Sequence, residues 1–281
     1  MRLGTKKVFG VGIIVGDYKW LDIFGDVDGW DLQHVRRVKW IKTYDDPKRF
    51  DTYTLKQGET TQKLNHDTSK DLIEWLQNLD VIQEKEYEEP EKLPDNSYIR
   101  NIGTEEISEF LFEHGVDSNS INTLIEEIDE LIRIAKWYKK KDKGPSEHET
   151  VTYLVVPLLR ALGWTPQKMG IEWKNIDLAL FCSLPRAGEN LDVVVEAKKK
   201  GNSCLTAKSQ AESYAIDRKN CHRVILTDGL RYGIFLRNND SFKLHSYLNL
   251  TNLKNCYPIY DCMGARESLL AMTPEYRASK I

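Results

Sequence analysis

The sequence is poor in cysteine, and its thiols follow neither a metal-binding nor a disulfide pattern. Its 281 residues contain five cysteines, which is an odd number, and no CxxC pair. The sequence therefore supports neither a disulfide framework nor a zinc site, and we expect reduced thiols in a cytoplasmic protein. The five cysteines are Cys182, Cys204, Cys221, Cys256 and Cys262.

Long apolar runs, nucleotide-binding loops and a strong charge of one sign are absent as well. No stretch of about 18 apolar residues and no signal-peptide pattern occurs, so we expect a soluble protein with no membrane partner. There is no GxxxxGK[ST] sequence, and the chain has no room for a helicase motor. Because 40 Lys and Arg residues nearly balance 43 Asp and Glu residues, for a net charge of -3, any nucleic-acid binding must depend on local basic patches.

The length of the chain is sufficient for two domains, each able to bury its own core. The distribution of helix and strand patterns predicts an α+β or α/β protein. An N-terminal domain is expected over residues 1–100, a helical connector over 101–143, and a second domain with a mixed sheet over 144–281.

Glycine and aromatic residues are frequent in the first part of the chain. Residues 8–16 have the pattern of a bent strand, with glycines where a barrel has to curve. In the strand expected over residues 34–40, alternation places His34, Arg36 and Trp40 on one face, which could combine aromatic and basic groups. The alternative for each tryptophan here is an ordinary place in the core of a small barrel.

Two amphipathic helices are predicted ahead of the second domain. Residues 104–114 and 118–141 carry apolar side chains at helical spacing, and an acidic segment over residues 83–95 precedes them as an exposed loop. Lysines follow at the end of the second helix. They either complement the helix dipole or contact phosphate groups.

A further helix is predicted to begin at Ser146 and to end at Gly163. Apolar residues recur along it at the spacing of one buried face. Ser146 and Glu149 have the spacing of a capping box, which explains Glu149 without any metal.

The most informative charged residues lie on two predicted strands, residues 176–181 and 191–198, which a turn-rich segment joins as a hairpin. Alternation places Glu196 and Lys198 on one face, where Asp177 of the first strand can face Glu196. Two carboxylates repel each other unless a cation lies between them, and oxygen ligands on rigid strands suit Mg²⁺. A salt-bridged strand pair is the alternative. The opposite, apolar face of the second strand is expected to comprise Leu191, Val193, Val195 and Ala197.

Asp177 followed by Glu196-x-Lys198 on the next strand resembles the PD-(D/E)XK nuclease superfamily. The helix before the hairpin looks like the first helix of the nuclease domain in type I restriction motor subunits. Gln210 and Tyr214 match the QxxxY element of that branch. The resemblance covers residues 144–250 and implies a restriction-endonuclease-like αβ fold with a mixed sheet.

This resemblance implies a Mg²⁺-dependent endonuclease that hydrolyses phosphodiester bonds of DNA. Lys198 would position or deprotonate the attacking water. Gln210 and Tyr214 would orient the nucleic-acid backbone or buttress the lysine, and the alternative is a surface amide and a core tyrosine. The metal ligands would be Asp177, Glu196, Glu149 and the carbonyl of Ala197, with Glu147 as the alternative to Glu149.

The N-terminal pattern is similar to PUA-like domains, especially the EVE type found beside restriction nucleases. The similarity rests on Gly10-Val11-Gly12, on a turn at Gly16-Asp17-Tyr18 and on the spacing of the polar and aromatic residues after it. It implies a β-barrel that holds a flipped, modified base in an aromatic pocket. The residues expected to line this pocket are Trp20, Trp30, His34, Arg36 and Trp40.

We therefore expect a restriction-type endonuclease whose partner is DNA, including DNA with modified bases, and which acts as a homodimer when it breaks both strands. Two alternatives remain. One is a protein that only binds nucleic acid or a partner, and the other is a nuclease subunit whose ATP-driven motor or restriction-modification partner is a separate chain.

Overall fold

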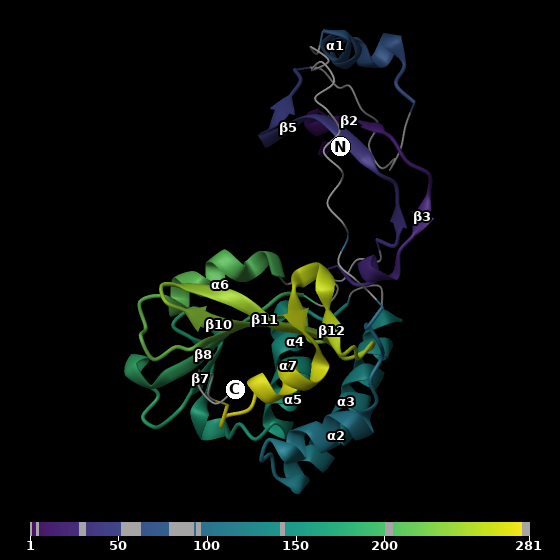
Figure 1. Cartoon of the computed structure of the whole chain (residues 1–281). Coiled ribbons are helices and arrows are strands. Elements are labelled where there is room, and N and C mark those ends of the chain that lie inside the picture. Colours follow the sequence, from purple (N-terminus) through teal and green to yellow (C-terminus); the bar gives the residue numbers. More distant parts are fainter. Residues whose placement is uncertain are drawn as a thin grey trace. The chain divides into compact units, whose positions relative to one another are not determined.

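The computed structural model divides the chain into two compact units (Figure 1). The first unit comprises Met1–Asp22 and Leu32–Leu93, and the second comprises Ile23–Asp31 and Pro94–Ile281. Trp30, and most of the acidic segment over residues 83–95, lie outside the residues that the structure describes. The described residues are 2–3, 6–27, 32–51, 63–78, 93, 97–140, 144–199 and 205–276.

A small antiparallel sheet is the main described feature of the first unit. β2 (Lys7–Ile14) pairs with β1 (Arg2–Leu3) on one side and with β5 (Val38–Arg49) on the other. β3 (Lys19–Trp20) and β4 (His34–Val35) form a separate antiparallel pair. Within the described ranges both sheets are open, so the barrel expected from the glycine pattern is not found in this part of the chain.

The glycines of β2 serve a purpose different from barrel closure. The register between β2 and β5 shifts beside Gly10 and again beside Gly12, so that the strand is bulged at both places. A side chain on Gly10 would come within 3.1 Å of the Trp40 ring and 3.0 Å of the Lys42 carbonyl. The glycine pattern therefore reflects bulges and a close approach of β5.

The buried core of the first unit consists of Val8, Phe50 and Leu72. Leu72 is supplied by α1 (His66–Gln77). The helix begins at Asn65, whose side-chain oxygen accepts the amide of Asp67 at 3.0 Å.

The second unit is built on an eight-stranded mixed sheet with the order β12-β13-β11-β10-β9-β8-β7-β6. β8 and β9 are parallel, and α6 connects them, while β6, β7 and β8 form an antiparallel meander. The sheet confirms an α+β protein with a large mixed sheet. Its strands are β6 (Met169–Trp173), β7 (Ile176–Phe181), β8 (Leu191–Ala197), β9 (Arg223–Thr227), β10 (Arg231–Asn238), β11 (Ser241–Asn249), β12 (Cys256–Tyr257) and β13 (Cys262–Met263).

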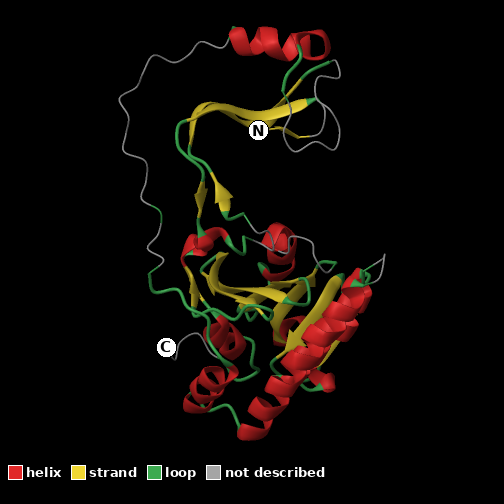
Figure 2. Ribbon diagram, turned by 90° about the vertical axis from the view of Figure 1, so that its right-hand side faces the viewer, coloured by secondary structure: helices red, strands yellow, loops and turns green. Residues whose placement is uncertain are grey.

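Helices cover both faces of this sheet (Figure 2). One face carries most of the helices, and the other carries the short helix α6. None of the described helices is both long and apolar enough to cross a membrane. The helices are α2 (Thr104–Glu113), α3 (Ser118–Lys139), α4 (Glu147–Thr150), α5 (Val156–Ala161), α6 (Lys208–Ala215) and α7 (Ala265–Ala271).

The two helices expected as a connector are present as α2 and α3. Their apolar faces bury Ile107, Leu111 and Leu131 in the same cluster as Leu178 and Val195 of the sheet. The connector helices therefore pack against the sheet and belong to the second compact unit.

Candidate active site

The β7–β8 hairpin brings two carboxylates face to face. Leu178 and Val195 are the last pair of the antiparallel register at this end, so Asp177 and Glu196 are the next residues on the two strands. The amide of Ala197 donates a hydrogen bond of 2.8 Å to Oδ2 of Asp177. This bond fixes the Asp177 carboxylate against the end of β8.

Glu196 is almost completely buried and only half satisfied. Lys198 Nζ donates to Glu196 Oε1 at 2.9 Å, and the two side chains are 22% and 1% exposed, respectively. The second oxygen, Oε2, is buried without a hydrogen-bond partner in the structure. A buried carboxylate oxygen that lacks a donor is energetically unfavourable, so this atom is available to a cationic ligand.

Electrostatic effects show which charges gather around this pair. Burial raises the pKa of the Glu196 carboxyl above its ordinary value; the hydrogen bond from Lys198 opposes this rise. The negative charges of Asp177 and Glu147 raise it further. Burial lowers the pKa of Lys198, but its bond to Glu196 and the charges of Glu147 and Asp177 outweigh burial and raise it overall. Three carboxylates therefore act on one ammonium group, which leaves the site negative.

The third acid comes from the first turn of α4, and two candidates lie there. Ser146 Oγ accepts the amide of Glu149 at 3.1 Å, and Glu149 Oε2 accepts the amide of Ser146 at 2.7 Å. These bonds form the capping box that the sequence predicts, and they lower the pKa of Glu149. Glu147, in contrast, acts electrostatically on both Glu196 and Lys198. The charge of Glu147 therefore acts on the strand residues, whereas Glu149 caps the helix.

The helix that carries these acids contains a π-helical turn, Val151–Val155, between α4 and α5. Pro157 gives a physical reason for this turn, because it has no amide to donate to residue 153 and its ring would clash with that carbonyl in a regular α-helix. A side chain on Gly229 would approach Leu154 to 2.7 Å and Thr150 to 3.0 Å. The loop after β9 therefore fits against this helix only because residue 229 is a glycine.

The QxxxY residues lie on α6, which packs on β8 and β9 through Ala207, Ala211 and Ala215. Gln210 is exposed, and its carbonyl accepts the Ser213 hydroxyl. Tyr214 is half-buried against the alanine face. These contacts match the simpler interpretation of a surface amide and a core tyrosine, and the supporting role of the pair stays a prediction.

The N-terminal candidate residues separate into different places within the first unit. Trp20 lies edge-on to His34 with ring centroids 4.7 Å apart, and the Tyr18 hydroxyl is 2.9 Å from His34 Nδ1. Trp40 lies over Gly10 instead, and Arg36 is exposed in the connection between β4 and β5. Trp30 is not among the described residues.

Tyr18 is the member of this aromatic group that the pocket prediction missed. Its signal in the sequence was the Gly16-Asp17-Tyr18 turn, which directly precedes β3. Tyr18 and Trp20 are 50% and 52% exposed, so both rings are accessible from solvent.

Among the residues that the structure describes, no group of three or more His, Cys, Asp or Glu side chains is arranged to hold a metal ion as it stands. Comparison with protein-family models, with curated proteins and with solved structures finds no match to this chain.

Proposed function

We propose that the protein is a Mg²⁺-dependent endonuclease that hydrolyses phosphodiester bonds of DNA. The observation that carries this proposal is the end of β8. There a buried glutamate with one unpartnered oxygen is bonded to a lysine, and the charge of Asp177 acts on it. Asp177, Glu196 and Lys198 provide the acids and the amine that metal-assisted phosphate hydrolysis needs.

The donor set fits Mg²⁺ rather than a softer metal, because every candidate ligand is an oxygen. Asp177 and Glu196 would hold the ion together with an acid from α4 and the Ala197 carbonyl. We favour Glu147 as that acid, because the Glu149 carboxylate would have to give up the hydrogen bond that it accepts from the Ser146 amide. Mg²⁺ bound there would supply positive charge to the phosphate as negative charge develops on it.

The roles of the side chains follow from their present contacts. Lys198 is held by Glu196 and is protonated at neutral pH, since its pKa is raised. With the Glu196 carboxylate engaged as a metal ligand, Lys198 Nζ would be free to orient the attacking water and to exchange a proton with it. Loss of a group with this role lowers a rate by about 10² to 10⁴.

The order of the elements supports the same proposal. A helix, the antiparallel strands β6, β7 and β8, the helix α6 and the parallel strand β9 follow one another along the chain. This is the order expected for a restriction-endonuclease-like domain.

We also propose that the first unit reads modified bases. The exposed rings of Tyr18 and Trp20, with His34 between them, support this role because a flipped base stacks on aromatic side chains. Breaking both strands would favour two copies of the chain, each with one site.

Cleavage assays with purified protein and Mg²⁺ test the proposal. Plain DNA and DNA rich in modified cytosine should be compared for the wild type, Lys198→Ala and the control Lys199→Ala, which changes an exposed neighbour. Cleavage should be lost only with Lys198→Ala. Absence of Mg²⁺-dependent cleavage of either DNA by the wild type would refute the proposal.

A second comparison identifies the acid of α4. Glu147→Gln should abolish most of the cleavage, whereas Glu149→Gln should retain it, because glutamine can still cap Ser146. The reverse order would assign the role to Glu149.

The alternative function is a protein that binds nucleic acid without cutting it. The 2.9 Å pair of Lys198 with Glu196 favours it, since a salt bridge accounts for both residues without catalysis. Binding without cleavage, also after addition of ATP and partner subunits, would establish this alternative; cleavage only with those additions would identify a motor-dependent subunit.

A further inference from the structure

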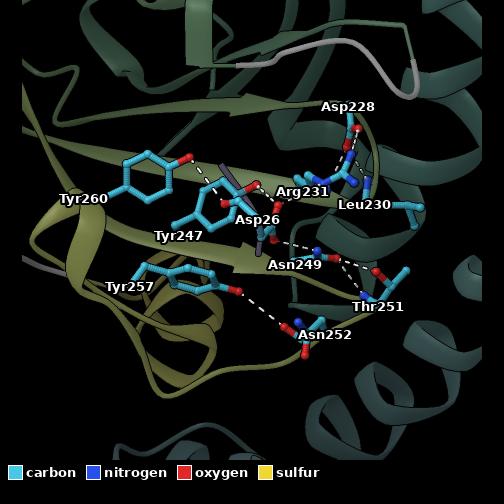
Figure 3. A network of polar contacts seen from close by, with 10 residues as sticks. All are labelled: Asp26, Asp228, Leu230, Arg231, Tyr247, Asn249, Thr251, Asn252, Tyr257 and Tyr260. Atoms are coloured by element: carbon cyan, nitrogen blue, oxygen red, sulfur yellow. Dashed lines mark hydrogen bonds and ion pairs between the residues drawn. The ribbon is translucent and has the colours of Figure 1, made fainter. Parts of the chain in front are cut away.

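Asp26 is a buried acid in the segment that joins β3 to β4, and it belongs to the second unit. Figure 3 shows its contacts with Tyr247, Asn249 and Arg231. The residue is 5% exposed. Asn249 Nδ2 donates to Asp26 Oδ2 at 2.7 Å, and the Tyr247 hydroxyl donates to Oδ1 at 3.2 Å. The Tyr260 hydroxyl donates to the Asp26 carbonyl at 3.5 Å. Side chain and backbone of Asp26 are therefore both held by β11 and the segment after it.

Arg231 links Asp26 to the turn between β9 and β10. Its Nε lies 3.4 Å from Asp26 Oδ1, an ion pair without hydrogen-bond geometry, and its Nη1 donates to Asp228 Oδ2 at 3.0 Å. The other oxygen of Asp228 accepts the amides of Leu230 and Arg231 at 3.1 and 2.8 Å. The Arg231 guanidinium thus joins the Asp228 carboxylate, which shapes the turn, to the Asp26 carboxylate.

The last residue of β9 and the turn that follows it contact the two elements of the candidate active site. The amide of Lys198 donates to the Thr227 carbonyl at 2.7 Å, directly before the turn. Gly229 fits against Thr150 and Leu154 of the helix that carries the α4 acids. A movement of this turn would therefore displace Lys198 and that helix together.

Asn249 makes the network selective for an acceptor at position 26. Its Oδ1 accepts both the amide and the hydroxyl of Thr251, at 3.0 and 2.7 Å. Its Nδ2 consequently points to Asp26. An amide at position 26 would present a donor to Asn249 or to the cation of Arg231, so the carboxylate has a role that its near-isostere cannot take.

We propose that Asp26 is a positioning residue for cleavage: through Arg231 it holds the turn of residues 228–231, and through this turn it holds Lys198 and the acid-bearing helix. The proposal depends on the proposed nuclease function.

Asp26→Asn tests this role, with Asp22→Asn as the matched control. Asp22 is exposed and accepts only the neighbouring Trp20 indole among its described contacts. The single-turnover cleavage rate and the DNA dissociation constant should be measured for wild type and both variants, together with hydrogen exchange at the amides of residues 229–231. In Asp26→Asn the rate should fall roughly tenfold or more and exchange should accelerate by a similar factor, while the dissociation constant stays within about twofold. Asp22→Asn should match the wild type.

A cleavage rate unchanged in Asp26→Asn, or a fall matched by weaker DNA binding, would overturn the positioning role. If Asp26→Asn does not fold, Tyr247→Phe replaces it, because this change removes one bond to Asp26 and should produce a smaller effect in the same direction. A wild type that never cuts DNA would refute the proposed function and the link to cleavage. Faster exchange in Asp26→Asn would then still establish the anchor.

Discussion

Glu196→Gln should stabilise the metal-free protein even though it removes one half of an ion pair. Burial raises the pKa of Glu196, and this effect outweighs the opposing bond from Lys198. A carboxyl pKa that is higher in the folded state means that ionised Glu196 opposes folding at neutral pH. Glutamine keeps the shape and an acceptor for Lys198, but it carries no charge.

The magnitude follows from the two oxygens of Glu196. The glutamine amide nitrogen that replaces Oε2 is also buried without a partner but is uncharged, so the variant is relieved only of the extra cost of the charge, about 1–3 kcal/mol. The lost pairing with Lys198, which is 22% exposed, offsets up to about 1 kcal/mol of that gain. A net gain of about 1–2 kcal/mol corresponds to a rise of about 2–8 °C in Tm for a domain of this size.

Thermal unfolding in EDTA at pH 7.5 measures this difference. Glu189→Gln, at an exposed position in the connection between β7 and β8, is the control and should leave Tm unchanged. Added Mg²⁺ should raise the Tm of the wild type more than that of Glu196→Gln, because the variant has lost a ligand oxygen.

The pH dependence provides a second check of the sign. The destabilisation by ionised Glu196 is complete above its raised pKa and disappears as the pH falls toward the ordinary value of 4.5. The difference between wild type and variant should therefore shrink with acidification. A lower Tm for Glu196→Gln than for the wild type in EDTA would refute the reasoning, since it would mean that Lys198 fully compensates the buried charge.

Three further predictions concern the supports of the site. Gly229→Ala should lower the free energy of unfolding by about 2 kcal/mol or more, because φ is +88° and the new side chain would clash with the π-helical turn. In urea unfolding Gly115→Ala, at φ +84° with nothing within 4 Å, should show only the backbone part of this loss. Arg223→Met should lower the free energy of unfolding by about 3–5 kcal/mol, because it leaves the buried Asp192 unpaired. The additional change Asp192→Leu should recover much of this loss, and equal losses in the single and double variants would contradict the prediction. Burial lowers the pKa of His245 below 6.5, so the protein should lose stability as the pH falls below 6.5 toward that lowered pKa. Between pH 7.5 and pH 5, Tm should therefore fall less in His245→Gln than in the wild type.

Local patterns were sufficient for the elements that surround the site. Helical periodicity predicted α2 and α3, and alternation predicted β7 and β8, because each pattern depends on which face of one element is buried. The capping box at Ser146 was also predictable, since both of its residues lie within one turn.

One prediction about β8 was wrong, for a reason that the sequence does not show. Leu191 was expected on the face of Val193, but it packs in the other cluster with Val194. The register of the β7–β8 pair shifts at Phe181, which lies opposite Leu191. This bulge turns Asp192 toward Arg223, and such a pairing depends on a strand far along the chain.

The glycines of β2 were misinterpreted for a related reason. A glycine in a strand predicts a place where the backbone bends or is closely approached, and both a barrel corner and a bulge meet that condition. The choice between them depends on which strands pair. In the described residues β5 supplies the approaching ring and carbonyl, and the sheet remains open.

The two glutamates of α4 show why the third acid was the hardest residue to assign. The resemblance favoured Glu149, but its spacing from Ser146 gives its carboxylate a local partner, the Ser146 amide. Glu147 has no capping position of this kind, and its charge acts across space on Glu196 and Lys198. An acid in the first turn of a helix can either cap that helix or act on a charged group far along the chain. Only the folded structure shows which of the two it does. Glu196 is buried and has one carboxylate oxygen without a partner, and the charge of Glu147 acts on it. We therefore expect Glu147 to share a cation with Glu196.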